Sequence, residues 1–137
     1  MLFYAPTIFI SAFLLFLIQP IIAKQILPWF GGSASVWTTA LVFFQVSLLA
    51  GYAYADATNR LVGRRVQAYL HIALLLVSLI FLPVVADSTW KPTGAENPSV
   101  QIIFLLLATI GLPFFLLSAT GPMVQSWFAR SFAERRV

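Results

Sequence analysis

Four long apolar stretches dominate the sequence, at about residues 2–23, 36–55, 66–86 and 100–120. The hydrocarbon core of a bilayer, roughly 30 Å thick, needs about 20 apolar residues in a helix, so each stretch is long enough to cross it. Runs such as HIALLLVSLIFL lack the alternation of apolar and polar residues that membrane β-strands require, which leaves helices. The sequence therefore predicts an all-α membrane protein, a polytopic bundle of four transmembrane helices that forms a single domain over residues 1–137.

The composition excludes several other classes of protein. Hydrophobic residues make up 61% of the chain and charged residues 9%, whereas a soluble domain has about 25% charged residues. A globule of this composition lacks the polar side chains needed to coat its surface. This excludes a soluble fold, a disordered chain and a nucleic-acid-binding module. The chain has no cysteine, so it can form neither disulfides nor cysteine metal sites.

Positive charges are distributed unequally between the two sides of the predicted membrane. With four spans, the N-terminus, the loop between the second and third spans and the C-terminus share one side, which carries six arginines, whereas the other side carries two lysines. Because cytoplasmic segments carry the excess of Lys and Arg, we expect a multi-pass inner-membrane protein with both termini in the cytoplasm. The arginines are Arg60, Arg64, Arg65, Arg130, Arg135 and Arg136, and the lysines are Lys24 and Lys91, the latter offset by Asp87 and Glu96.

The end of the first span contains a first candidate for a ligand site. Gln19 and Lys24 precede a segment that Pro28, Gly31 and Gly32 interrupt. One interpretation is a small cup outside the cytoplasm, in which Gln19 and Lys24 line a route for an anionic or polar ligand. The other is a tight interfacial turn, from which Lys24 extends to the lipid headgroups.

The second span contains small residues at four-residue spacing, Ser47, Gly51 and Ala55. Small residues on one face let two helix backbones approach closely, so we expect a packing seam against another helix of the chain, with a homodimer seam as the alternative. Gln45 lies near the middle of the same span. A carboxamide at that depth needs a partner, so we expect a hydrogen bond to another helix, with a substrate contact as the alternative.

The junction between the second and third spans contains Asp56, Arg60, Arg64 and Arg65. It resembles the Gly…Asp-Arg-x-Gly-Arg-Arg loop of major facilitator transporters, although three residues separate Asp56 from Arg60 where that motif places the acid and the first base side by side. One interpretation is that Asp56 pairs with arginines across a cytoplasmic turn and fixes the angle between two helices. The alternative is a solvated loop.

The remaining polar and helix-breaking residues lie in the third and fourth spans. We expect His71 to form a hydrogen bond to a neighbouring helix, with a ligand contact as the alternative. Gly111 and Pro113 predict a kink in the fourth span, and Pro122 after Gly121 predicts a helix break. Residues 122–134 then read as an interfacial helix along the inner membrane surface.

Residues for enzymatic chemistry are scarce. The glycines form no dinucleotide or phosphate-binding motif. One histidine and no cysteine can build neither a catalytic triad nor a zinc site, so we expect no cofactor, no metal and no catalysis by this chain alone.

Several sequence blocks resemble the N-terminal membrane region of membrane-bound spermidine-synthase-like proteins, which are polyamine aminopropyltransferase-like. The most specific block is 27–33 (LPWFGGS); others lie at 43–45 (FFQ), 51–55 (GYAYA), 119–122 (ATGP) and 125–128 (QSWF). In that family a transporter-like, multi-helix domain precedes an aminopropyltransferase-like domain. The resemblance implies that further helices and a soluble domain normally follow, and it places no catalytic residue in this chain.

These observations lead to one expected function and two alternatives. We expect an integral membrane module that anchors a cytoplasmic aminopropyltransferase-like domain or partner, or supplies it with a polar, cationic metabolite. The alternatives are a small-solute transporter of major-facilitator type and a non-catalytic accessory subunit of a membrane complex. The lipid bilayer is the partner common to all three.

Overall fold

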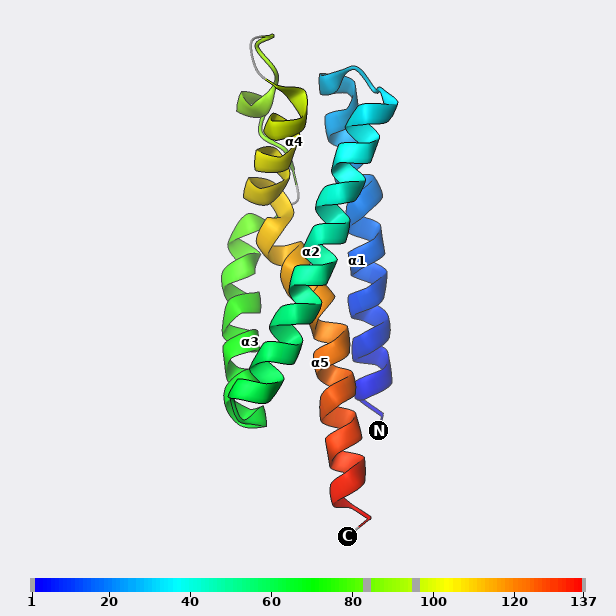
Figure 1. The fold of residues 1–137 in the computed structure, drawn as a ribbon, viewed down its shortest axis with the longest axis vertical. Coiled ribbons are helices and arrows are strands. Elements are labelled where there is room, and N and C mark those ends of the chain that lie inside the picture. The colour runs from blue at the N-terminus through cyan, green and yellow to red at the C-terminus, as the bar shows by residue number, and fades with distance from the viewer. Residues whose placement is uncertain (1, 83–84, 95–96, 137) are drawn as a thin grey trace.

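The computed structural model describes residues 2–82, 85–94 and 97–136, and these form a bundle of helices without any strand (Figure 1). Four helical segments in these ranges are long and apolar enough to cross a membrane: Tyr4–Phe30, Ala34–Leu61, Arg64–Phe81 and Pro98–Glu134. The prediction of an all-α bundle with four such helices is confirmed. Glu96, one of the acids weighed in the charge distribution, lies outside the described residues.

The first three spans follow one another through short turns. α1 (Tyr4–Ile26) continues into a 3-10 turn, η1 (Leu27–Phe30). α2 (Ala34–Leu61) runs back along α1 in the opposite direction (Figure 1). α3 (Arg64–Ser78) then begins after two extended residues and ends in the turn η2 (Leu79–Phe81).

The fourth span is irregular but continuous. α4 (Pro98–Leu106) passes into a π-helical turn, η4 (Leu107–Gly111), and then into α5 (Leu112–Glu134). Pro113 has no N–H and its ring clashes with the carbonyl four residues earlier, so the helix needs a wider turn beside it. The irregularity predicted from Gly111 and Pro113 is present as this π-helical turn.

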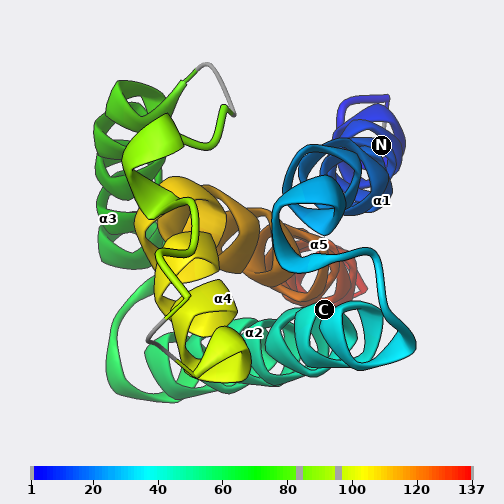
Figure 2. The same ribbon diagram turned by 90° about the horizontal axis from the view of Figure 1, so that it is seen from above.

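α5 lies at the centre of the bundle. It packs against α1, α2 and α3, while α4 packs against α2. Viewed from above, α1 and α3 lie on opposite sides of α5 (Figure 2). The core is apolar, and its largest fully buried side chains, Phe44 and Phe114, have ring centroids 5.1 Å apart. Many large apolar side chains elsewhere are exposed, as is expected for a chain whose outer surface faces lipid.

The second and third spans end at other residues than predicted. α2 extends to Leu61, beyond the predicted end at residue 55, because a charged residue can continue a helix after the apolar stretch has ended. The third span stops at Phe81, before the predicted end at residue 86. Leu82 is extended, with φ −89° and ψ 145°, as the residue before a proline prefers. A short 3-10 turn, η3 (Ser88–Trp90), lies between the third and fourth spans.

The break predicted at Gly121 and Pro122 is wrong. α5 is a single helix from Leu112 to Glu134, with Pro122 in its interior, so residues 122–134 continue the last span rather than form a separate helix. In a membrane bundle, neighbouring helices and hydroxyl side chains can compensate for the hydrogen bond that a proline removes.

Candidate functional site

A buried amide joins three helices at the arginine-rich end of the bundle. The Gln67 side chain, 0% exposed, lies between α2, α3 and α5. Its Nε2 donates to Thr58 Oγ1 at 2.8 Å and to the Ala55 carbonyl at 3.3 Å, and its Oε1 accepts from Trp127 Nε1 at 2.7 Å. Gln67 was not among the residues predicted from the sequence. An amide within an apolar span was the available signal.

His71, one turn further along α3, bonds to α5. Its Nε2 lies 2.9 Å from Thr120 Oγ1, and the Thr120 hydroxyl donates to the Leu116 carbonyl at 2.8 Å. Thr120 therefore accepts from His71, which assigns the proton of the neutral imidazole to Nε2 and leaves Nδ1 as an acceptor. The predicted hydrogen bond from His71 to a neighbouring helix is present.

Two buried polar atoms beside these contacts have no hydrogen-bond partner among the described residues. They are Tyr54 Oη and His71 Nδ1. The two rings stack with centroids 6.0 Å apart and an interplanar angle of 29°. Unpaired polar atoms are costly in an apolar interior, so this contact between α2 and α3 is less well satisfied than the bonds of Gln67.

The small residues of α2 form a close contact with α5. A Cβ atom added to Gly51 would clash with the Ser118 side chain and lie 2.9 Å from the Phe115 carbonyl oxygen. Ala55 is buried in a cluster with Ala119 and Met123 of α5. These contacts agree with the predicted seam within one chain, whereas Ser47 is only half-buried.

Gln45 does not make the predicted hydrogen bond to another helix. Its side chain is exposed on the outer face of α2, and no hydrogen bond joins it to another of the described helices. Phe43 and Phe44 occupy the inward face instead. The prediction of a helix-to-helix bond for Gln45 is therefore wrong within the described residues.

Gln19 and Lys24 do not form a cup. Lys24 is exposed and Gln19 half-buried, and neither lines a major cavity of the described bundle. The neighbouring Gln25 makes the connection at this end, since its Oε1 accepts from the Ala86 N–H at 2.9 Å.

The charged junction is arranged differently from the predicted turn. Because α2 extends past residue 55, Asp56 and Arg60 lie one turn apart in one helix, with Arg60 Nε 3.0 Å from Asp56 Oδ2. This exposed pair does not connect two helices, so of the two interpretations of this junction, the pairing of Asp56 across the turn is wrong. Arg64 Nη1 instead lies 4.0 Å from Glu134 Oε2 at the end of α5. Arg65 is exposed nearby.

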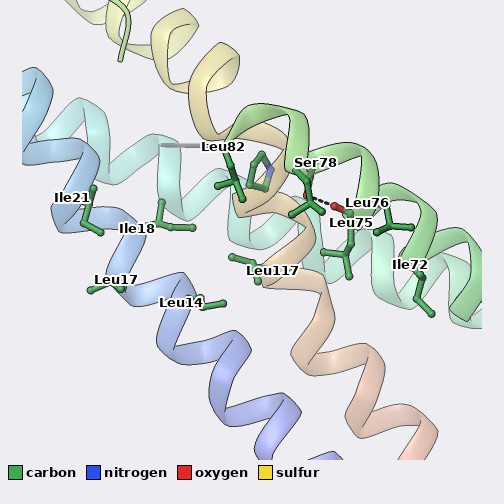
Figure 3. A pocket seen from close by; sticks show the side chains of 12 residues that line it. Leu14, Leu17, Ile18, Ile21, Ile72, Leu75, Leu76, Ser78, Leu82 and Leu117 are labelled. Atoms are coloured by element: carbon green, nitrogen blue, oxygen red, sulfur yellow. Dashed lines mark hydrogen bonds between the residues drawn. The ribbon is translucent and has the colours of Figure 1, made fainter. Parts of the chain in front are cut away.

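Two cavities lie between α1, α3 and α5. We call the first the basic pocket; it has a volume of about 470 Å³ and opens at the arginine-rich end, where Arg64, Arg65 and Arg135 line it. We call the second the apolar groove; it has a volume of about 570 Å³. Leucine and isoleucine side chains of α1 and α3 face each other across it, with Leu117 of α5 between them (Figure 3).

Neither the described residues nor known proteins provide a catalytic assignment. No cluster of three or more potential metal-ligating side chains occurs in the described ranges. Comparison with protein-family models, curated proteins and solved structures finds no match for this chain.

Proposed function

We propose that this chain is the integral membrane module of a spermidine-synthase-like protein and anchors a cytoplasmic domain or partner. The sequence blocks at residues 27–33 and 51–55 support the relationship. In the structure, residues 27–33 form η1 and the glycines that follow it, of which Gly31 has φ 87°. Residues 51–55 contain Gly51, which makes the close contact with α5.

The position of α5 carries the proposal. This helix packs against three others and continues beyond the ends of α1 and α3 at the arginine-rich side (Figure 1). Ser126 Oγ donates to Asn59 Oδ1 at 2.9 Å, and Arg130 Nη2 donates to the Asn59 carbonyl at 2.9 Å. Because these bonds fix α5 against α2, the end of α5 has a defined position to which a domain can be attached or bound.

The charge distribution supports placing this side in the cytoplasm of an inner membrane. The described arginines belong to the α2–α3 junction and to the C-terminal part of the chain, which lie at one end of the bundle (Figure 1). Lys24 is in the last turn of α1, and Lys91 Nζ lies 5.4 Å from the ring centroid of Trp29 in η1, at the other end. Under the positive-inside rule, both termini are then cytoplasmic.

Anchoring has more support than supply or transport of a cationic metabolite. Gln19, Lys24 and Gln45 do not converge on a route through the described bundle. The basic pocket, at the proposed cytoplasmic end, is lined by three arginines, whose positive charges repel a polyamine.

The test is purification of the full chain from its own membrane in mild detergent, followed by native mass spectrometry. We expect a partner in fixed stoichiometry that carries a domain outside the membrane. The variant Phe132→Ala with Arg136→Ala, at the exposed end of α5, should lose this partner. The matched control Leu61→Ala, at the exposed end of α2, should retain it.

Two results would overturn the proposal. One is a wild-type chain that purifies without any stoichiometric partner. The other is equal retention of the partner by the α5 variant and the Leu61→Ala control.

A further inference from the structure

The basic pocket has the charge of an anion site. Arg64 and Arg65 from the first turn of α3 and Arg135 from the end of α5 line it, against the single acid Glu134. Arginine side chains bind phosphate oxygens through paired, charge-assisted hydrogen bonds. Three arginines around one opening therefore favour a ligand with a phosphate group.

The one acid of the pocket is a weak competitor for this ligand. Arg64 Nη1 and Glu134 Oε2 are 4.0 Å apart, at the limit of an ion pair, and the Glu134 side chain is 71% exposed. Such a solvated pair contributes little to stability. A phosphate can thus replace the carboxylate beside Arg64 at small cost.

Aromatic side chains place the pocket at the membrane interface. Tyr4 and Trp127 line it, and Tyr4 packs edge-to-face on Phe128, with ring centroids 5.5 Å apart. Trp and Tyr prefer the headgroup level of a bilayer. A phosphate at the headgroup level of the bilayer is therefore in the right place to enter this pocket.

The apolar groove begins one helical turn from the basic pocket on α3, and about 15 Å from it along α1 and α5. On α3, Ala68 lines the basic pocket and Ile72 lines the groove. Leu76 and Leu79 continue the same face at three- and four-residue spacing. On α5, Trp127 and Ser131 line the pocket, whereas Leu117 lines the groove.

The length of the groove matches a lipid chain. From Arg65 to Ile72 the rise along α3 is about 10 Å, and from Ile72 through the end of α3 and the 3-10 turn η2 to Leu82 it is about 15–18 Å. Half of a hydrocarbon core is also about 15 Å. A chain that starts at the basic pocket therefore enters the groove within its own leaflet. Ser78 is the one polar lining residue, and its hydroxyl already donates to the Leu75 carbonyl at 2.7 Å.

We propose that the space between α1, α3 and α5 binds one anionic phospholipid of the arginine-side leaflet. Arg64, Arg65 and Arg135 hold its phosphate in the basic pocket, and one acyl chain lies in the apolar groove. The bound lipid fills the space that separates α1 from α3 on the open side of α5 (Figures 2 and 3).

The headgroup contact is tested by native mass spectrometry of the full chain with phosphatidylglycerol and, separately, with phosphatidylcholine. We expect phosphatidylglycerol to bind more tightly. Arg64→Gln with Arg65→Gln should weaken its binding about tenfold or more. The control Arg60→Gln with Arg136→Gln, which removes the same charge outside the pocket, should change it less than about threefold. Glu134→Gln should strengthen binding.

The groove is tested separately. Leu76→Trp should fill the groove and weaken phosphatidylglycerol binding, whereas Leu49→Trp, at an exposed position of α2 outside the groove, should not. Glycerol phosphate, which has no acyl chain, should compete poorly. Equal binding of the two lipids, equal losses in the two arginine pairs, or full competition by glycerol phosphate would each overturn the proposal.

Discussion

At the residue scale, two side chains of α3 hold the helices together through polar contacts. Gln67 joins α2, α3 and α5, and His71 joins α3 to Thr120 of α5. A hydrogen bond in such a site contributes modestly, but leaving one buried partner unpaired is expensive. Substitutions on the two sides of one bond are therefore not equivalent.

We expect Thr120→Val to destabilise the bundle more than His71→Phe does. Thr120→Val leaves both ring nitrogens of His71 buried without partners, at a cost of about 1–3 kcal/mol. After His71→Phe, the Thr120 hydroxyl still donates to the Leu116 carbonyl. The measurement is the free energy of unfolding in mixed detergent micelles. Equal losses in the two variants would contradict the assigned bond.

A second prediction concerns the glycines of the spans. Gly51→Ala places a Cβ 2.9 Å from the Phe115 carbonyl oxygen and should cost about 1–3 kcal/mol. Gly121→Ala, also within a helix, meets nothing within 4 Å and should be neutral or stabilising by about 0.5–1 kcal/mol. Thermal unfolding of the two variants in one detergent checks the difference. A Gly51→Ala protein as stable as Gly121→Ala would contradict the close contact.

The sequence allows prediction of some of these residues but not of others. Gly51 and Ala55 were predictable because small residues at four-residue spacing have few other uses in a membrane helix. The direction of Gln45 was not, because both faces of α2 are apolar around it: Phe43 and Phe44 face inward, and Val46 faces outward. Gln67 was missed because its partners are up to 60 positions away in the sequence.

At the element scale, the continuity of α5 is the main difference from the sequence-based expectation. The four spans follow from apolar length and from the lack of β-type alternation, because a helix satisfies its own backbone hydrogen bonds in lipid. The passage of α5 through Pro122 does not, since it depends on contacts with neighbouring helices. Asn59 and Ser126 form one such contact beyond the proline, with Oδ1 and Oγ 2.9 Å apart.

Cysteine cross-linking tests this arrangement without background, because the chain has no cysteine of its own. Asn59→Cys with Ser126→Cys should cross-link efficiently under mild oxidation or with a short bifunctional reagent. Asn59→Cys with Gln125→Cys should not, because Gln125 lies at a cavity lined by α1 residues such as Ile8. Equal yields from both pairs would show that this part of α5 does not pack on α2 as described.

At the scale of the whole molecule, the separation of charges predicts the orientation in the membrane. An alkaline phosphatase reporter, active only outside the cytoplasm, should be inactive when fused after Arg65 and active when fused after Trp90. A reporter active only in the cytoplasm should give the opposite pattern. An active phosphatase after Arg65 and an inactive one after Trp90 would reverse the proposed orientation and move the arginine-lined end to the outside.

The π-helical turn of residues Leu107–Gly111 has a consequence for how this helix tolerates insertions and deletions. Such a turn accommodates one residue more than an α-helical turn, and so sets the rotational phase of α4 relative to α5. Deleting one residue there would rotate the two halves by about 100° relative to each other. Ile102 and Leu105, now at most 1% exposed, would then leave the interior, so the surplus residue is part of the packing rather than a defect in it.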